Sequence, residues 1–165
     1  MIDLDKINQW DEKTACERFY QCCSSKNWAW RMAHSRPFQT AEILLQTAQN
    51  IWEELASEDY LEAFEGHPRI GDMNSLKKKY STRDWSSQEQ SGVDVCSEEV
   101  LSELAKLNTI YEKRFGFIFI VCATGKSAEE MLDLLKGRID NTREHEISNA
   151  AHEQAKITKI RLEKL

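Results

Sequence analysis

Glycine and proline are scarce in this chain, and that scarcity is the strongest constraint on its fold. Among 165 residues, six are glycine and two are proline. Both residues interrupt helices, so their scarcity favours helical structure. Hydrophobic residues make up 41% of the chain, which is enough to build a core and argues against disorder. The length fits one domain over residues 1–165, without repeats or linkers.

Hydrophobic periodicity and capping residues locate the helices. We expect them over residues 2–10, 11–23, 41–55, 57–64 and 98–115, and from about residue 141 to the C-terminus. Thr40 and Ser97 stand where a side-chain oxygen would cap the helices that follow them. Ser127 and Glu130 have the spacing of a capping box, which predicts one more helix after residue 127.

Residues 115–123, FGFIFIVCA, break the helical pattern. They are apolar, aromatic and β-branched, so their propensity favours a buried strand. No second segment of this kind is present to pair with it. A lone strand leaves backbone N–H and C=O groups unpaired, and something must satisfy them.

Charge and cysteine content exclude several classes of protein. A net charge of -6 argues against nucleic-acid binding, which needs a basic surface. No apolar run approaches the ~20 residues that span a membrane, and the first residues do not form a signal peptide. The five cysteines include an adjacent pair and no C-x-x-C, which fits neither a disulfide framework nor a zinc site. We therefore expect a soluble cytoplasmic protein.

Histidine spacing predicts no metal site. His145 and His152 are not arranged as H-E-x-x-H, and His34 is isolated. We expect His145 and His152 on the solvent face of their helix. The five tryptophans are expected in the core.

The stretch FEGHPRIGD, residues 64–72, places a histidine directly before a proline. A residue before proline is disfavoured in helical conformation, so His67 should sit on extended backbone at a helix end. Gly71 permits a bend before Asp72, which could cap a further helix. A rigid loop that fixes an imidazole suits acid–base chemistry near neutral pH. The loop alone favours the plainer alternative, a histidine with an ordinary hydrogen bond.

Two further motifs allow both a structural and a functional interpretation. Ser86-x-x-Glu89 and Ser87-x-x-Gln90 match capping boxes, so a helix start is as good an interpretation as a site. Glu89 gains a functional role if it turns towards His67, because a carboxylate would orient the ring and raise its pKa. The stretch ATGKS resembles a phosphate-binding loop, but Ile120 stands where that motif needs glycine. We reject nucleotide binding.

Arg161 shares one helical stripe with Ala150, Gln154 and Ile157, spaced by three or four residues. It therefore lies on or beside an apolar face. One alternative is a side chain that extends to solvent at the helix end. The other is a guanidinium that binds a substrate carboxylate.

Taken together, these motifs resemble the family of 2-oxo-4-hydroxy-4-carboxy-5-ureidoimidazoline (OHCU) decarboxylases, which form S-allantoin in urate breakdown. The resemblance is carried by HPRIG, SSQEQ and FGFIFIVCA in this order and spacing, and by WAWRMAHSRPF near the N-terminus. It covers nearly the whole chain. The C-terminal helix is the looser part of the match.

The resemblance implies that His67 and Glu89 are catalytic. It also implies these substrate contacts: Pro68, Ser86, Gln90, Arg161 and the backbone of Phe119, Ile120, Val121, Cys122 and Ala123. The family fold is all-helical, the assembly is usually a homodimer, and no metal or other cofactor is used. Residues 117–123 should then be a short extended segment among helices rather than a strand.

The implied activity is a cofactor-free carbon–carbon lyase reaction on a small anionic ureidoimidazoline. Unpaired backbone groups of residues 119–123 would contact the donors and acceptors of the ureido arm, as a strand partner does. Apart from the resemblance, two alternatives stay open. One is a hydrolase that opens a related cyclic ureide, and the other is a helical interaction module without activity.

Overall fold

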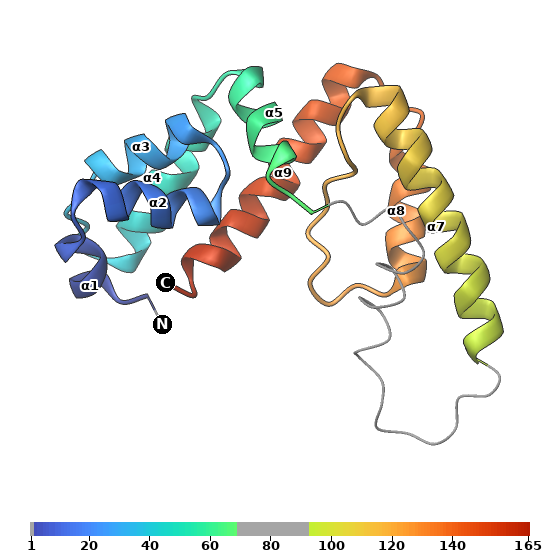
Figure 1. Ribbon diagram of the computed structural model, residues 1–165, viewed down its shortest axis with the longest axis horizontal. Helices are drawn as coiled ribbons and strands as arrows, with labels where there is room; N and C mark the ends of the chain where they lie inside the picture. The colour runs from blue at the N-terminus through green and yellow to red at the C-terminus, as the bar shows by residue number, and fades with distance from the viewer. Residues whose placement is uncertain (1, 69–92) are drawn as a thin grey trace. The chain divides into compact units, whose positions relative to one another are not determined.

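The computed structural model describes residues 2–68 and 93–165, with side chains described outside 93–97. This part of the chain is helical and contains no strand (Figure 1), which confirms the predicted all-α class. The chain divides into two compact units. The first consists of Met1–His67, Ile120–Cys122 and Ile147–Leu165, and the second of Pro68–Phe119 and Ala123–Glu146. Each is described by itself.

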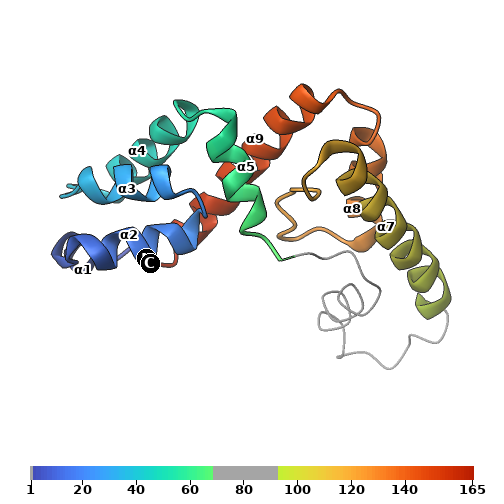
Figure 2. The ribbon, with the colours of Figure 1, turned by 45° about the horizontal axis from the view of Figure 1, so that its top comes forward.

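The first unit contains five consecutive helices and most of the last helix. They are α1 (Leu4–Gln9), α2 (Glu12–Cys22), α3 (Lys26–His34), α4 (Ala41–Glu53), α5 (Ser57–Glu65) and α9 (Arg143–Leu162) from Ile147 on. Helix α3 packs against α2, α4 and α5 (Figure 2). Thr40 Oγ1 accepts from the N–H of Ile43 at 3.1 Å, which confirms the predicted cap of α4.

Aromatic rings fill the core of the first unit. Phe19 makes edge-on contacts with Trp28 and Phe38, and all three are buried. The indole N–H of Trp28 donates to the carbonyl of Ala48 at 3.0 Å, so the buried polar atom is satisfied. The prediction that every tryptophan lies in the core is wrong for Trp30, which is 53% exposed. It lies on the outer face of α3, away from the stripe that contains Trp28.

Within the WAWRMAHSRPF stretch, Arg36 ties helix ends together. Its guanidinium donates to the backbone oxygens of Ile7 at 3.1 Å, Trp10 at 2.6 Å and Ala33 at 2.9 Å. These carbonyls lie at the C-terminal ends of α1 and α3, where helices leave acceptors unpaired. This part of the motif therefore has a structural explanation.

The second unit contains α7 (Val93–Phe115), α8 (Ala128–Arg138) and the first residues of α9. Helices α7 and α8 pack side by side (Figure 2). The predicted cap at Ser97 is wrong, because α7 already begins at Val93. Residues 93–96 contain neither glycine nor proline, so nothing in them stops the helix from starting before Ser97. The capping box of Ser127 and Glu130 is confirmed, with hydrogen bonds of 2.7 and 3.2 Å.

Gly116 ends α7. Its φ of +80° is a left-handed conformation, and its N–H donates to the carbonyl of Glu112 at 2.8 Å. From residue 118 to residue 123 the backbone belongs to neither helix nor strand. The strand that propensity favoured is absent there, and the extended segment that the resemblance implied is confirmed.

The last helix, α9, begins at Arg143, two residues after the predicted start at Asn141. His145 and His152 on this helix are exposed, as predicted. In the described part of the chain, no helix is both long and apolar enough to cross a membrane.

Candidate functional site in the first unit

His67 lies directly after the end of α5. The helix stops at Glu65, and the N–H of His67 donates to the carbonyl of Phe64 at 3.2 Å. His67 is half-buried, whereas Pro68 is exposed. The position of the helix end agrees with the sequence prediction, since proline at residue 68 disfavours helix at residue 67.

Gly66 allows this loop to lie against the connection between α2 and α3. A Cβ atom at residue 66 would lie 2.1 Å from Oγ and 2.2 Å from Cβ of Ser24. The φ of Gly66 is -72°, which any residue can adopt, so space rather than backbone conformation requires glycine here. This close approach fixes the position of the backbone just before His67.

Gln154 is the side chain that contacts the imidazole. Its Oε1 forms a short hydrogen bond with Nε2 of His67, and its Nε2 donates to Oγ1 of Thr158 at 3.1 Å. Gln154 is fully buried and Thr158 nearly so. A buried amide is costly unless it is hydrogen-bonded, and here both ends of the amide have partners.

Arg161 lies one turn beyond Ile157 on the same helix and is half-buried. Its Nη1 donates to the carbonyl of Cys22 at 3.2 Å, at the C-terminal end of α2. This position rules out an arginine that only extends into bulk solvent. It leaves two roles that are compatible, holding α2 and presenting the remaining guanidinium donors to an anion.

Burial lowers the pKa of His67 below its ordinary value. The hydrogen bond to Oε1 of Gln154 opposes this effect, and the positive charge of Arg161 adds to it. The lowered pKa favours the uncharged imidazole, which can accept a proton near neutral pH. A histidine in this state suits a general base.

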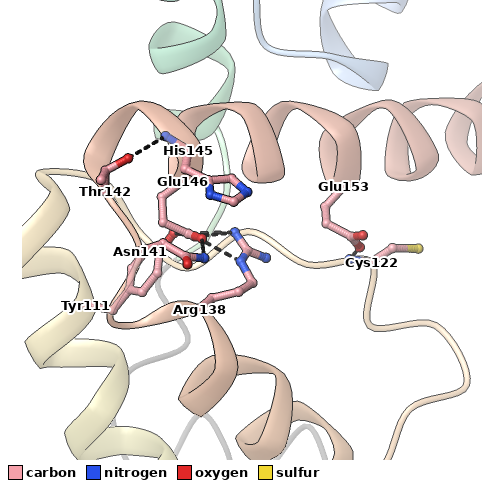
Figure 3. Close-up of polar contacts among 8 residues, drawn as sticks. All are labelled: Tyr111, Cys122, Arg138, Asn141, Thr142, His145, Glu146 and Glu153. Carbon is pink, nitrogen blue, oxygen red and sulfur yellow. Dashed lines mark hydrogen bonds and ion pairs between the residues drawn. The ribbon is translucent and has the colours of Figure 1, made fainter.

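The short segment Ile120–Cys122 also belongs to the first unit. The N–H of Cys122 donates to Oε2 of Glu153 at 2.8 Å (Figure 3). The N–H of Cys122 is therefore not unpaired, as the sequence prediction had assumed, and contact between the backbone of residues 119–123 and the substrate stays a prediction. Ile120 is buried and Val121 half-buried.

Phe119 belongs to the second unit, where a buried polar network holds its ring. The guanidinium of Arg138 lies 4.6 Å from the ring centroid, and the ring of Tyr111 packs edge-on at 5.3 Å. Fully buried Glu146 accepts from Tyr111, from Arg138 Nε at 2.9 Å and from Asn141 at 2.8 Å (Figure 3). Burial, followed by the bond to Glu146, raises the pKa of Tyr111.

Sequence reasoning assigned no role to Gln154, Glu153 or Glu146. Gln154 carried a signal, because a polar residue on an apolar stripe needs a partner. Glu153 and Glu146 carried none, since glutamate is common on solvent-facing helix surfaces.

Several predicted site residues lie outside the described part of the chain. These are Ser86, Glu89 and Gln90, together with the predicted cap at Asp72. The pairing of Glu89 with His67 therefore stays a prediction. Among the described residues, no group of histidine, cysteine, aspartate and glutamate side chains is arranged to hold a metal ion.

Curated relatives share the sequence over most of its length. The uric acid degradation bifunctional protein TTL of Arabidopsis thaliana is 41% identical over 87% of this chain and 45% of its own length. The 2-oxo-4-hydroxy-4-carboxy-5-ureidoimidazoline decarboxylase of Haloferax volcanii is 24% identical over 98% of this chain and 94% of its own. The chain spans less than half of the bifunctional relatives, 45% of the Arabidopsis protein and 32% of the Bacillus subtilis protein PucL.

A solved structure is also similar to this chain over nearly its whole length. A crystal structure of OHCU decarboxylase in the presence of (S)-allantoin is 35% identical, has a TM-score of 0.72, and covers 94% of this chain and 97% of its own. The family model described as OHCU decarboxylase matches residues 8–163. The chain belongs to the OHCU decarboxylase family.

Proposed function

We propose that this chain decarboxylates 2-oxo-4-hydroxy-4-carboxy-5-ureidoimidazoline to S-allantoin in urate catabolism. One observation carries the proposal: His67 sits on a fixed loop, and its imidazole is half-buried and held at Nε2 by Gln154. The family and the relatives named for uric acid degradation support the choice of substrate. All of residues 1–165 form the decarboxylase domain in this proposal.

The chemistry needs an acid–base group and a shielded pocket. The bond from C4 to the carboxylate breaks, and its electron pair forms a double bond to C5 while the ring C=N bond accepts charge at nitrogen, which takes up a proton. The C4 hydroxyl then loses its proton and C5 gains one. Because the substrate supplies its own electron sink, the reaction requires no metal or organic cofactor.

We assign the C4 hydroxyl proton to His67, which takes it up as general base. Glu89 orients the imidazole or stabilises its charged form. Arg161 contacts an oxygen of the substrate through guanidinium donors other than the one bonded to Cys22. Pro68, Ser86, Gln90 and residues 119–123 line the substrate, and protonation of C5 from one face gives a single enantiomer.

The test is to add the protein to freshly made urate-oxidation product and to follow optically active allantoin by circular dichroism. We expect faster formation of S-allantoin with release of CO2. A ring-opened product without CO2 would instead support a hydrolase. If neither product forms faster than in buffer, the chain is an interaction module.

We further propose that the protein works as a homodimer in the cytoplasm. Among the described residues, Cys16, Cys22, Cys23 and Cys122 form no disulfide, which is compatible with a reducing compartment. Light scattering coupled to size exclusion tests the assembly, with a mass of twice 19.2 kDa as the expected result. A mass of 19.2 kDa at assay concentration contradicts the dimer.

A further inference from the structure

We propose that Gln154 is a positioning residue that fixes the tautomer of His67, so that Nδ1 is the atom that takes the substrate proton. The inference rests on the proposed function for the identity of that proton. The fixed tautomer itself rests on contacts within the first unit.

The orientation of the Gln154 amide follows from its second partner. The amide NH2 of Gln154 donates to Oγ1 of Thr158 at 3.1 Å. The carbonyl Oε1 of Gln154 therefore faces His67.

An amide oxygen carries no proton, so the hydrogen bond to Oε1 needs a proton on Nε2 of His67. In the uncharged ring the lone pair then resides on Nδ1. When Nδ1 takes up a proton, Nε2 keeps its own, and Gln154 stays bonded in both states. The ring does not need to turn during the reaction.

A neutral acceptor also preserves the basicity that the reaction uses. A carboxylate at the position of Gln154 would hold His67 as an imidazolium, which cannot take a proton. Among the described residues, the charged group near His67 is that of Arg161, which lies on α9 together with Gln154. Cys22 and Cys23 remain thiols, because burial raises their pKa values to about 11 and about 12.

The same contact restricts the role of Glu89. With Nε2 bonded to Gln154, the ring nitrogen left for a carboxylate is Nδ1. A carboxylate can bond to Nδ1 only after that atom has been protonated. Glu89 would then stabilise the imidazolium that forms during the reaction.

The first experiment reads the ring directly by 15N-detected NMR of the imidazoles, with His67→Asn used to assign the His67 signals. Above pH 8, about 1.5 units beyond the ordinary imidazole pKa, we expect the Nε2–H tautomer in the wild type. Thr158→Val removes the acceptor of the amide, so a mixture of tautomers is expected. A dominant Nδ1–H tautomer in the wild type overturns the inference, whether or not the protein decarboxylates anything.

The second experiment compares Gln154→Glu with Gln46→Glu, which makes the same change of charge at an exposed position of α4. Gln154→Glu should raise the pKa of His67 by about one unit or more and shift the acidic limb of kcat/KM upward by the same amount. Activity should return at high pH, which a purely structural defect would not allow. The Gln46 variant should match the wild type.

If the pKa of His67 shifts equally in the two glutamate variants, or shifts in neither, the role of Gln154 is contradicted. If Gln154→Glu does not fold, Gln154→Leu gives the same answer by NMR, because loss of the acceptor should release the tautomer. If the kinetic profile moves while the tautomer does not, the tautomer inference is wrong and the proposed function stands.

Discussion

At the scale of single residues, His67, Glu89 and Arg161 carry the proposed chemistry. His67→Asn and Glu89→Gln should each lower kcat/KM by roughly a hundredfold to ten-thousandfold, because general acid–base catalysis contributes about that much. Glu89→Gln keeps the side-chain size, and His67→Asn keeps a polar side chain that cannot act as a base near neutral pH. Steady-state kinetics beside a melting curve give the result, and wild-type turnover in either folded variant shows that its assigned role is wrong.

Arg161→Ala should lower kcat/KM about tenfold to a hundredfold, since a charge-assisted hydrogen bond contributes ~1.5–3 kcal/mol. Arg161→Lys should recover little, because lysine lacks the planar fork. The alanine variant should also melt lower, since Arg161 holds the carbonyl of Cys22 at the end of α2. The pKa of His67 should rise, because a nearby positive charge is lost.

An unchanged kcat/KM in the folded Arg161→Ala variant would leave this arginine with its contact to α2 alone. A drop in melting temperature without any kinetic change has the same meaning.

The lowered pKa of His67 predicts how stability depends on pH. The unfolded chain binds a proton at this histidine near its ordinary pKa of 6.5, whereas the folded chain binds it only at lower pH. The contribution of His67 to the free energy of unfolding is therefore present above pH 6.5 and is lost as pH falls through the folded pKa. His67→Asn should flatten this decline in denaturant titrations of the folded variant.

At the scale of elements, the loop after α5 is fixed by contact between chain segments. Gly66→Ala should destabilise the protein by ~1–3 kcal/mol and lower activity, because the new methyl group overlaps Ser24. Gly137→Ala is the matched control. A Cβ at residue 137 in α8 meets nothing within 4 Å, and alanine should add about 0.5–1 kcal/mol of stability.

The double variant Gly66→Ala, Ser24→Gly should recover the stability lost through the overlap, since it removes the atoms that the methyl group meets. Chemical denaturation of the four proteins measures this. Equal effects of Gly66→Ala and Gly137→Ala would exclude the close approach as the reason for glycine.

The elements also show what a sequence can reveal. The caps at Thr40 and Ser127 were predictable, because capping uses residues within one turn. The start of α7 was not, since the serine at residue 97 imitates a cap that the longer helix does not need. The strand propensity of residues 118–123 was overridden, because no partner strand is present in the described chain and a side chain, Glu153, takes the N–H of Cys122.

At the scale of the whole molecule, the motifs identified the family, and the family implied the all-helical fold. The helical stripe correctly grouped Gln154 with Arg161, and the bond from His67 to Gln154 joins residues 87 positions apart. Periodicity within one helix cannot predict which distant residue meets that stripe. The network around Glu146 was missed for the same reason, since Tyr111 comes from another helix.

Helix α9 presents Glu153, Gln154, Thr158 and Arg161 within nine positions of one rigid helix. The site is therefore tuned to the register of α9, and a change of length should harm it more than most changes of side chain. An alanine inserted after Asn149 turns every later residue by about 100° around the axis. The circular dichroism spectrum should still be that of a helical protein. Decarboxylation should be lost, and His67 should become a mixture of tautomers. An alanine inserted after Lys164 should leave activity near wild type, and equal activity of the two insertions would contradict this dependence on register.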